Sequence, residues 1–175
     1  MSVPLSPGVF VVASPKLAEN PHFARKVVLV LRHSADKGTS GVVINWPLSQ
    51  GHATELMHLA GGLEHLQTPD SRLFFDGGPI EPKMLVTLHR AGHLVGGTPF
   101  FEDVHAGGNL EALRAHATSM DPQRPLLRLY LGYASWSPGQ LEKEIAGGFW
   151  SLSPGSADLV FSNTPELVWQ QLSPP

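Results

Sequence analysis

Short apolar runs, each closed by a turn residue, constrain this chain most. The runs are rich in Val, Leu and Phe and are bounded by Gly, Pro, Asn or Asp, a pattern typical of buried strands rather than of helices. The final long run, 126–133, hardly alternates between apolar and polar residues, so we expect it to be covered on both faces and central in its sheet. The expected strands are 9–13, 27–31, 42–44, 73–75, 84–89 and 126–133, with weaker ones at 150–152 and 159–161.

Helices are announced by capping residues. Ser137-Pro138-Gly139-Gln140 predicts a helix start, with Ser137 as the cap, Pro138 in the first turn and the Gln140 amide returning to a free backbone N–H. Leu141 and Ile145 supply an apolar face, and Gly147-Gly148 predicts the end. Further helices are expected after Thr164-Pro165-Glu166, after Asn109 with Leu110, Leu113 and Ala117 facing inward, and over residues 54–60.

These elements predict one mixed α/β domain over residues 1–175. Strands and helices are interspersed without a regular strand–helix–strand rhythm, and neither an internal repeat nor a long linker divides the chain. Cysteine is absent, which excludes disulfides and thiolate metal sites. The N-terminal residues lack a basic segment followed by a long apolar run, so we expect a cytoplasmic protein without a membrane segment.

Charge argues against a dedicated DNA-binding protein. Charged residues make up 15% of the chain and the net charge is −3, whereas a protein that neutralises several phosphates needs clustered Lys and Arg. Arg25-Lys26 is the only adjacent basic pair among 12 basic residues. Nucleic acid is therefore not an expected partner, while the low charge favours self-association into a homo-oligomer.

The common catalytic and cofactor signatures are missing. The sequence contains no GxxxxGK[ST], GxGxxG or GxSxG pattern. His89 and His93 have the spacing of two helical metal ligands, but the residues between them predict a turn. The remaining histidines close in sequence, His52, His58 and His65, straddle a glycine pair. We therefore expect neither a metal nor another cofactor.

Two segments contain residues that would be unfavourable for folding unless they have a specific role. Asp76-Gly77-Gly78-Pro79 ends a strand with two glycines that allow a close approach of backbone or ligand. In the second segment, residues 132–142, Tyr133 and Trp136 lie between a central strand and a helix start, where unpaired N–H groups favour an anion or small ligand. The alternatives are a tight turn for the first segment and, for the second, aromatic core residues with Gln140 as a helix cap.

Several segments, in this order, resemble the bacterial AlgH/YqgE family over roughly residues 7–152. They are Ala13-Ser14-Pro15, Asn20-Pro21-His22-Phe23, residues 41–47, Gly77-Gly78-Pro79-Ile80, Leu88-His89, residues 131–136, Gly139-Gln140-Leu141-Glu142 and Trp150. The resemblance implies a bifurcated mixed sheet, partly curled into a small closed barrel and surrounded by helices. It implies no established reaction, because members are described as uncharacterised or as candidate transcriptional regulators. Two residues depart from the family pattern: Trp46 stands where Arg is usual, and Ser135 where Gly is usual.

The leading hypothesis is a non-catalytic module that binds a small ligand or a protein, with an indirect role in transcriptional regulation. Its site would combine the corner Gly77-Gly78-Pro79 with the hydrogen-bonding groups of Asn45 and Gln140, the apolar walls Tyr133 and Trp136, and the charge of Glu142. The first alternative is a hydrolase that uses Ser14 or Ser40 with His33 or His89, which requires a hydrogen bond within such a pair. The second is direct DNA binding, which the charge disfavours.

Overall fold

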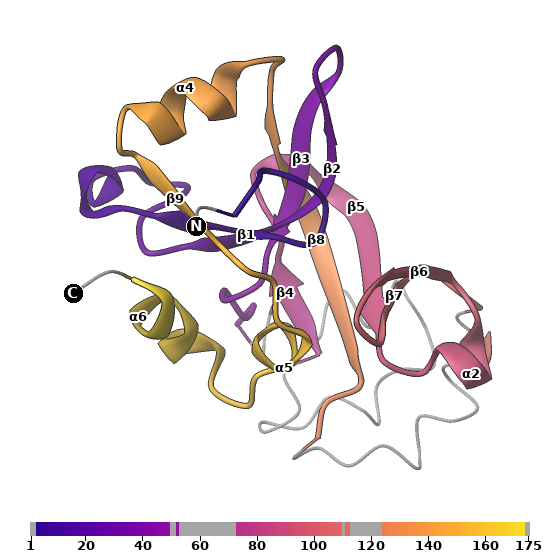
Figure 1. Ribbon diagram of the computed structural model, residues 1–175. Helices are drawn as coiled ribbons and strands as arrows, with labels where there is room; N and C mark the ends of the chain where they lie inside the picture. Colours follow the sequence, from indigo (N-terminus) through magenta and orange to yellow (C-terminus); the bar gives the residue numbers. More distant parts are fainter. Residues whose placement is uncertain (1–2, 50–51, 53–72, 110, 113–123, 174–175) are drawn as a thin grey trace.

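A single sheet of nine described strands forms the centre of the protein (Figure 1). The computed structural model describes residues 3–49, 52, 73–109, 111–112 and 124–173. Its strands are β1 (Phe10–Ala13), β2 (Val27–Ser34), β3 (Gly38–Val43), β4 (Phe74–Asp76), β5 (Ile80–His89), β6 (Thr98–Phe101), β7 (Val104–Ala106), β8 (Leu127–Trp136) and β9 (Trp150–Ser153). The helices are η1 (Pro15–Leu17), α2 (Gly92–Val95), α4 (Gln140–Ala146), α5 (Ala157–Val160), η4 (Pro165–Leu167) and α6 (Val168–Leu172).

The sheet is strongly curled and branches at β8. The strand order is β6-β7-β5-β8-β3-β2-β1-β9, and β4 pairs with β8 outside this path. β5 lies antiparallel to β8, while the other side of β8 pairs first with β4 and then with β3. The expected branching is therefore present, and β8 is central as predicted. The closed barrel is not confirmed, because the terminal strands of the path, β6 and β9, do not pair with each other.

Both faces of the β1–β3 region are buried. Alternate residues of β1 belong to different clusters: Phe10 and Val12 pack in the main core, and Val11 and Ala13 pack on the opposite face. Helices α5 and α6 add Ala157, Val160 and Val168 to the main core, and α4 adds Leu141 to the opposite one. In Figure 1, α4 accordingly lies on one side of the sheet and α5 and α6 on the other. This two-faced burial explains why the strands appear as unbroken apolar runs.

The direction of the side chains along β8 changes at Gly132. Tyr130 and Tyr133 both pack toward the main core although they are three positions apart, whereas Ala134 and Trp136 pack in the opposite cluster. A regular strand alternates with period two, so the register must gain one residue between the tyrosines. Gly132 supplies it with a left-handed φ of 75°, a conformation that glycine adopts at little cost.

Most expected elements are confirmed, often with longer bounds. Residues 159–161 are the exception, because α5 covers Ala157–Val160 and Ser156 Oγ accepts a hydrogen bond from Leu159 N–H as a helix cap. The predicted start of α4 is wrong by two residues: its N-cap is Gly139 rather than Ser137, and Pro138 lies in the turn before the helix, which begins at Gln140. Asn109 accepts hydrogen bonds from the N–H groups of Glu111 and Ala112, as a cap would. The expected helix over 54–60 lies outside the described residues, as do residues 110 and 113–123 of the helix expected after Asn109. No helix in the described ranges has the length and apolar character to span a membrane.

Substituting Gly132 by Ala should cost at least about 3 kcal/mol of the free energy of unfolding. A methyl group there would overlap the Gly78 carbonyl oxygen, in addition to the cost of a left-handed φ. Gly139 is the matched control, since its φ is 79° and the space for a Cβ is open, so Gly139→Ala should cost only about 1–2 kcal/mol. Urea denaturation measures both. Equal losses would contradict the close packing of β8 on the glycine corner.

Candidate functional site

The three backbone segments expected to form the site lie side by side. Gly77 N–H donates to the Leu131 carbonyl on β8 at 2.7 Å, and Val43 N–H donates to the Gly77 carbonyl at 2.9 Å. Asp76 N–H donates to the Trp46 carbonyl at 2.9 Å. The glycine corner therefore joins β8 to the bend that contains Asn45 and Pro47. Gly77 and Gly78 are buried against β8, while Pro79 is exposed.

The Asn45 side chain is fully engaged with backbone. Its Oδ1 accepts a hydrogen bond from Val27 N–H at 2.9 Å, and its Nδ2 donates to the Arg25 carbonyl at 2.9 Å. The residue is 3% exposed. Asn45 thus fixes the chain between Arg25 and Val27, where Arg25 itself has a left-handed φ of 61°. In this structure it offers a structural contact rather than a group that faces a ligand.

Trp136 lies on the face opposite to Tyr133. It is 3% exposed and stacks on Phe23, with Trp150 packed edge-on against both rings. Tyr133 and Trp136 both follow the shift at Gly132 and are three positions apart. An odd separation in a strand places side chains on opposite faces. The predicted recess with Tyr133 and Trp136 as its two walls is therefore wrong, and the alternative interpretation of Trp136 as a core residue is confirmed.

Glu144, for which the sequence pattern predicted no role, accepts hydrogen bonds from the polar groups of this aromatic cluster. Its Oε2 accepts hydrogen bonds from the indole N–H groups of Trp136 at 3.1 Å and Trp150 at 2.8 Å. Its Oε1 accepts one from Gln140 Nε2 at 3.0 Å. The available signal was the spacing of four residues from Gln140, which puts both side chains on one helical face.

Gln140 and Glu142 also take local roles. Gln140 Oε1 accepts a hydrogen bond from Ser137 N–H at 2.9 Å, which is the expected return of a capping side chain. Glu142 lies 3.7 Å from His33 Nε2 and is half exposed. The helix start therefore presents a closed set of polar contacts.

An open groove of about 820 Å³ lies on the Tyr133 face of β8. Residues from β2, β3, β5, β6, β7 and β8 line it. Its apolar lining consists of Leu31, Met84, Val86, Phe100 and Ala106. Leu31, Val86, Phe100, Ala106 and Tyr133 also pack against the main core. The groove is thus the place where the main core reaches the surface.

Polar and charged groups rim the groove. The β2–β3 hairpin contributes Arg32 and Lys37, and the opposite wall on β5 contributes Glu81. His33 also borders the groove, but its Nδ1 lies 2.8 Å from Thr39 Oγ1 and its Nε2 lies 3.7 Å from Glu142 of α4, so its ring is turned toward the opposite face of the sheet. The hydroxyl side chains among the lining residues are Ser34, Thr39, Ser40, Thr98, Tyr133 and Ser135.

One wall is widened by an irregularity in β5. Ile80 pairs with Tyr133 and Leu85 pairs with Leu131, so the intervening residues of β5 bulge away from β8. Ile80, Met84 and Leu85 are among the exposed large apolar side chains, and Met84, at 49% exposed, lines the groove. The bulge therefore adds apolar surface at the groove mouth.

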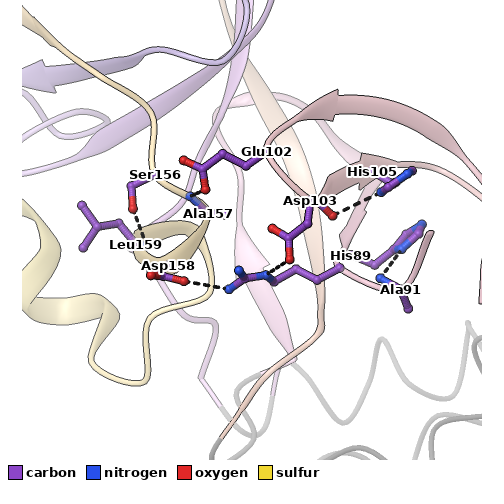
Figure 2. A network of polar contacts seen from close by, with 10 residues as sticks. His89, Ala91, Glu102, Asp103, His105, Ser156, Ala157, Asp158 and Leu159 are labelled. Atoms are coloured by element: carbon purple, nitrogen blue, oxygen red, sulfur yellow. Dashed lines mark hydrogen bonds and ion pairs between the residues drawn. The ribbon is translucent and has the colours of Figure 1, made fainter. Parts of the chain in front are cut away.

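A polar clamp fastens the β6–β7 hairpin, which forms another wall. Arg90 Nε donates to Asp103 Oδ2 at 2.8 Å, and Arg90 Nη1 donates to Asp158 Oδ1 at 3.0 Å. Glu102 Oε2 accepts from Ala157 N–H at the start of α5, and Figure 2 shows Glu102 and Asp103 facing this helix. The hydrogen bond from Arg90 lowers the pKa of Asp103. The clamp ties β6, with Thr98 and Phe100, to the body of the protein.

The serines and histidines considered as catalytic pairs of a hydrolase are not hydrogen-bonded to one another. His89 is buried, its Nδ1 accepts a hydrogen bond from Ala91 N–H, and its ring stacks on His105; burial lowers its pKa. Ser14 Oγ donates to the Gly148 carbonyl. Among the described residues, no hydrogen bond joins Ser14 or Ser40 to His33 or His89, and no group of three His, Asp or Glu residues could hold a metal. His58 and His65 lie outside the described residues.

The Trp46 ring contacts the side chain of a lysine. The Lys26 ammonium lies 4.6 Å from the centre of the Trp46 ring, in the geometry of a cation–π contact. Lys26 is 8% exposed, and burial lowers its pKa while the Asp76 carboxylate opposes this shift. The tryptophan at this position therefore shields a buried lysine.

Comparisons with known proteins give likenesses over nearly the whole chain. A family model described as AlgH-like matches residues 10–173. A UPF0301 protein of Methylococcus capsulatus is 34% identical over 165 residues, covering 94% of this chain and 87% of the relative. One of Anaeromyxobacter sp. is 37% identical over 172 residues, covering 95% and 85%.

Two solved structures share the fold. The crystal structure of protein DIP2367 from Corynebacterium diphtheriae superposes with a TM-score of 0.72 at 24% identity, covering 98% of this chain and 87% of that one. The solution structure of the AlgH protein from Pseudomonas aeruginosa gives 0.64 at 26% identity, covering 95% and 86%.

Glu144→Ala should lower the free energy of unfolding by about 2–4 kcal/mol, because it leaves two buried indole N–H groups without an acceptor. Glu142→Ala, on the same helix, should change it by no more than about 0.5–1 kcal/mol, because its ion pair is exposed. Thermal or urea denaturation separates the two. A larger loss for Glu142→Ala would show that the wrong glutamate had been assigned to the aromatic cluster.

Proposed function

We propose that this protein, which belongs to the AlgH-like family, is a non-catalytic module that binds a small ligand in the groove. Membership of the family indicates a fold but no reaction, so the proposed function rests on the groove. The ligand occupies the groove between the β2–β3 hairpin and the β5 bulge. An indirect role in transcriptional regulation would follow if occupancy of the groove alters contacts with a further protein. Of the side chains predicted to form the site, Tyr133 lines the groove. Asn45, Trp136, Gln140 and Glu142 have structural roles instead.

The observation that carries this proposal is the groove itself. Small-molecule sites are concave, about 300–1,000 Å³ in volume, and mostly apolar with a few placed polar groups. The groove of about 820 Å³ has an apolar floor made by the edge of the main core and a rim of hydroxyl and charged groups. Such a combination buries the body of a small molecule and orients its polar end.

Binding is favoured over hydrolysis by the polar contacts at the rim. Ser40 and His33 both line the groove, but His33 Nδ1 is next to Thr39 Oγ1, and its Nε2 faces Glu142. A serine nucleophile needs the imidazole within hydrogen-bond reach to accept its proton. The described contacts supply no such arrangement.

Filling the groove should weaken binding of an uncharged apolar probe. N-phenyl-1-naphthylamine fluoresces more strongly on leaving water, so its titration reports binding. Ser135 is exposed and lines the groove, so Ser135→Trp should weaken the affinity at least about tenfold. Lys143→Trp adds the same side chain on the exposed face of α4, away from the groove, and should leave the affinity within about twofold.

Circular dichroism establishes that both variants are folded. Equal affinity of Ser135→Trp and the parent protein would refute the proposed function, since the probe would then bind elsewhere.

A further inference from the structure

We propose that the ligand of the groove is an amphiphilic organic anion, with its anionic group at the β2–β3 hairpin and its apolar body toward β5 and β6. This inference rests on the proposed function and adds the chemical class of the ligand. It depends on how charge and apolar surface are distributed along the groove.

The hairpin wall carries the cations. Arg32 and Lys37 are exposed and line the groove with positively charged side chains. Glu81 is the one carboxylate among the lining residues, and it belongs to β5 on the opposite wall. The chain as a whole has a net charge of −3, so this local excess of positive charge runs against the overall sign.

Among the residues that the structure describes, no carboxylate forms an ion pair with Arg32 or Lys37. By contrast, Arg90 bridges Asp103 and Asp158, and Lys26 stacks on Trp46. A cationic wall that faces a cavity, and whose charges form no ion pair within the described ranges, complements an anionic group on a ligand. An arginine fork further suits the planar geometry of a carboxylate.

The remainder of the groove is suited to an apolar body. Met84, Val86 and Phe100 line the side away from the cations, and Phe100 packs edge-on against Phe101. A fully hydrophilic anion such as inorganic phosphate would leave this surface exposed to water. The combination of the two surfaces therefore selects a molecule with one anionic end and one apolar end.

A pair of matched probes tests the proposal. 8-Anilino-1-naphthalenesulfonate has the ring system of the uncharged naphthylamine and adds one sulfonate, so the ratio of their affinities isolates the charge. We expect the sulfonate probe to bind the parent protein at least about fivefold more tightly, with an affinity that falls as salt is raised.

The double variant Arg32→Gln/Lys37→Gln should remove this advantage, weakening the sulfonate probe about fivefold or more while the uncharged probe stays within twofold. Arg124→Gln/Lys143→Gln removes the same charge from exposed residues that do not line the groove and should change neither affinity by more than twofold.

Competition distinguishes the two sources of such an anion. Decanoate represents an alkyl acid and 2-naphthoate an aromatic acid, and either one should displace the sulfonate probe from the parent protein more effectively than decanol or 2-naphthol of the same body. The better competitor identifies the apolar body.

Equal affinities of the two probes, with no effect of Arg32→Gln/Lys37→Gln, would overturn the anion inference while leaving the proposed function intact. Failure of Ser135→Trp to block the uncharged probe would instead remove the proposed function itself.

Discussion

The left-handed glycine in the middle of β8 is the constraint on which the rest of the structure depends. Gly132 shifts the alternation of the strand by one residue, so that Tyr130 and Tyr133 face the same core while Ala134 and Trp136 face the other. One strand can therefore serve two differently oriented parts of the sheet: it pairs with β4 and β5 on one stretch and with β3 on the next. The groove and the aromatic cluster lie on opposite sides because Tyr133 and Trp136, which both follow the shift, are an odd number of positions apart in the strand.

Much of the fold could be predicted from the sequence, because buried strands and capped helices leave local signals. The runs around Val27 and Leu129 are strands, and Gln140 returns to the backbone as a capping residue should. Residues 159–161 were predicted wrongly, since a run of three apolar residues fits a helix as well as a strand. The Ser156 cap was the deciding signal.

The site was harder to predict because it depends on which face each side chain occupies. The expected proximity of the glycine corner, β8 and the bend that contains Asn45 is confirmed by the hydrogen bonds between them. Tyr133 and Trp136 point apart because β8 continues to Trp136, beyond the end predicted at 133. The sequence also does not reveal that Glu144 rather than Glu142 accepts both indole N–H groups. Nor could local patterns assemble the groove, because its walls come from strands far apart in the chain and are held by long-range contacts such as Arg90 with Asp158.

The central claim is that ligands bind on the Tyr133 face of β8 and not on the Trp136 face. A titration of ¹⁵N-labelled protein with 8-anilino-1-naphthalenesulfonate tests it most directly, because the two indole N–H signals of Trp136 and Trp150 report on one face and the amides of the β2–β3 hairpin on the other. The account predicts shifts concentrated at Arg32, Lys37 and Ser135, with both indole signals unchanged. Shifts concentrated on the indole signals, with unchanged amide signals from the β2–β3 hairpin, would contradict it.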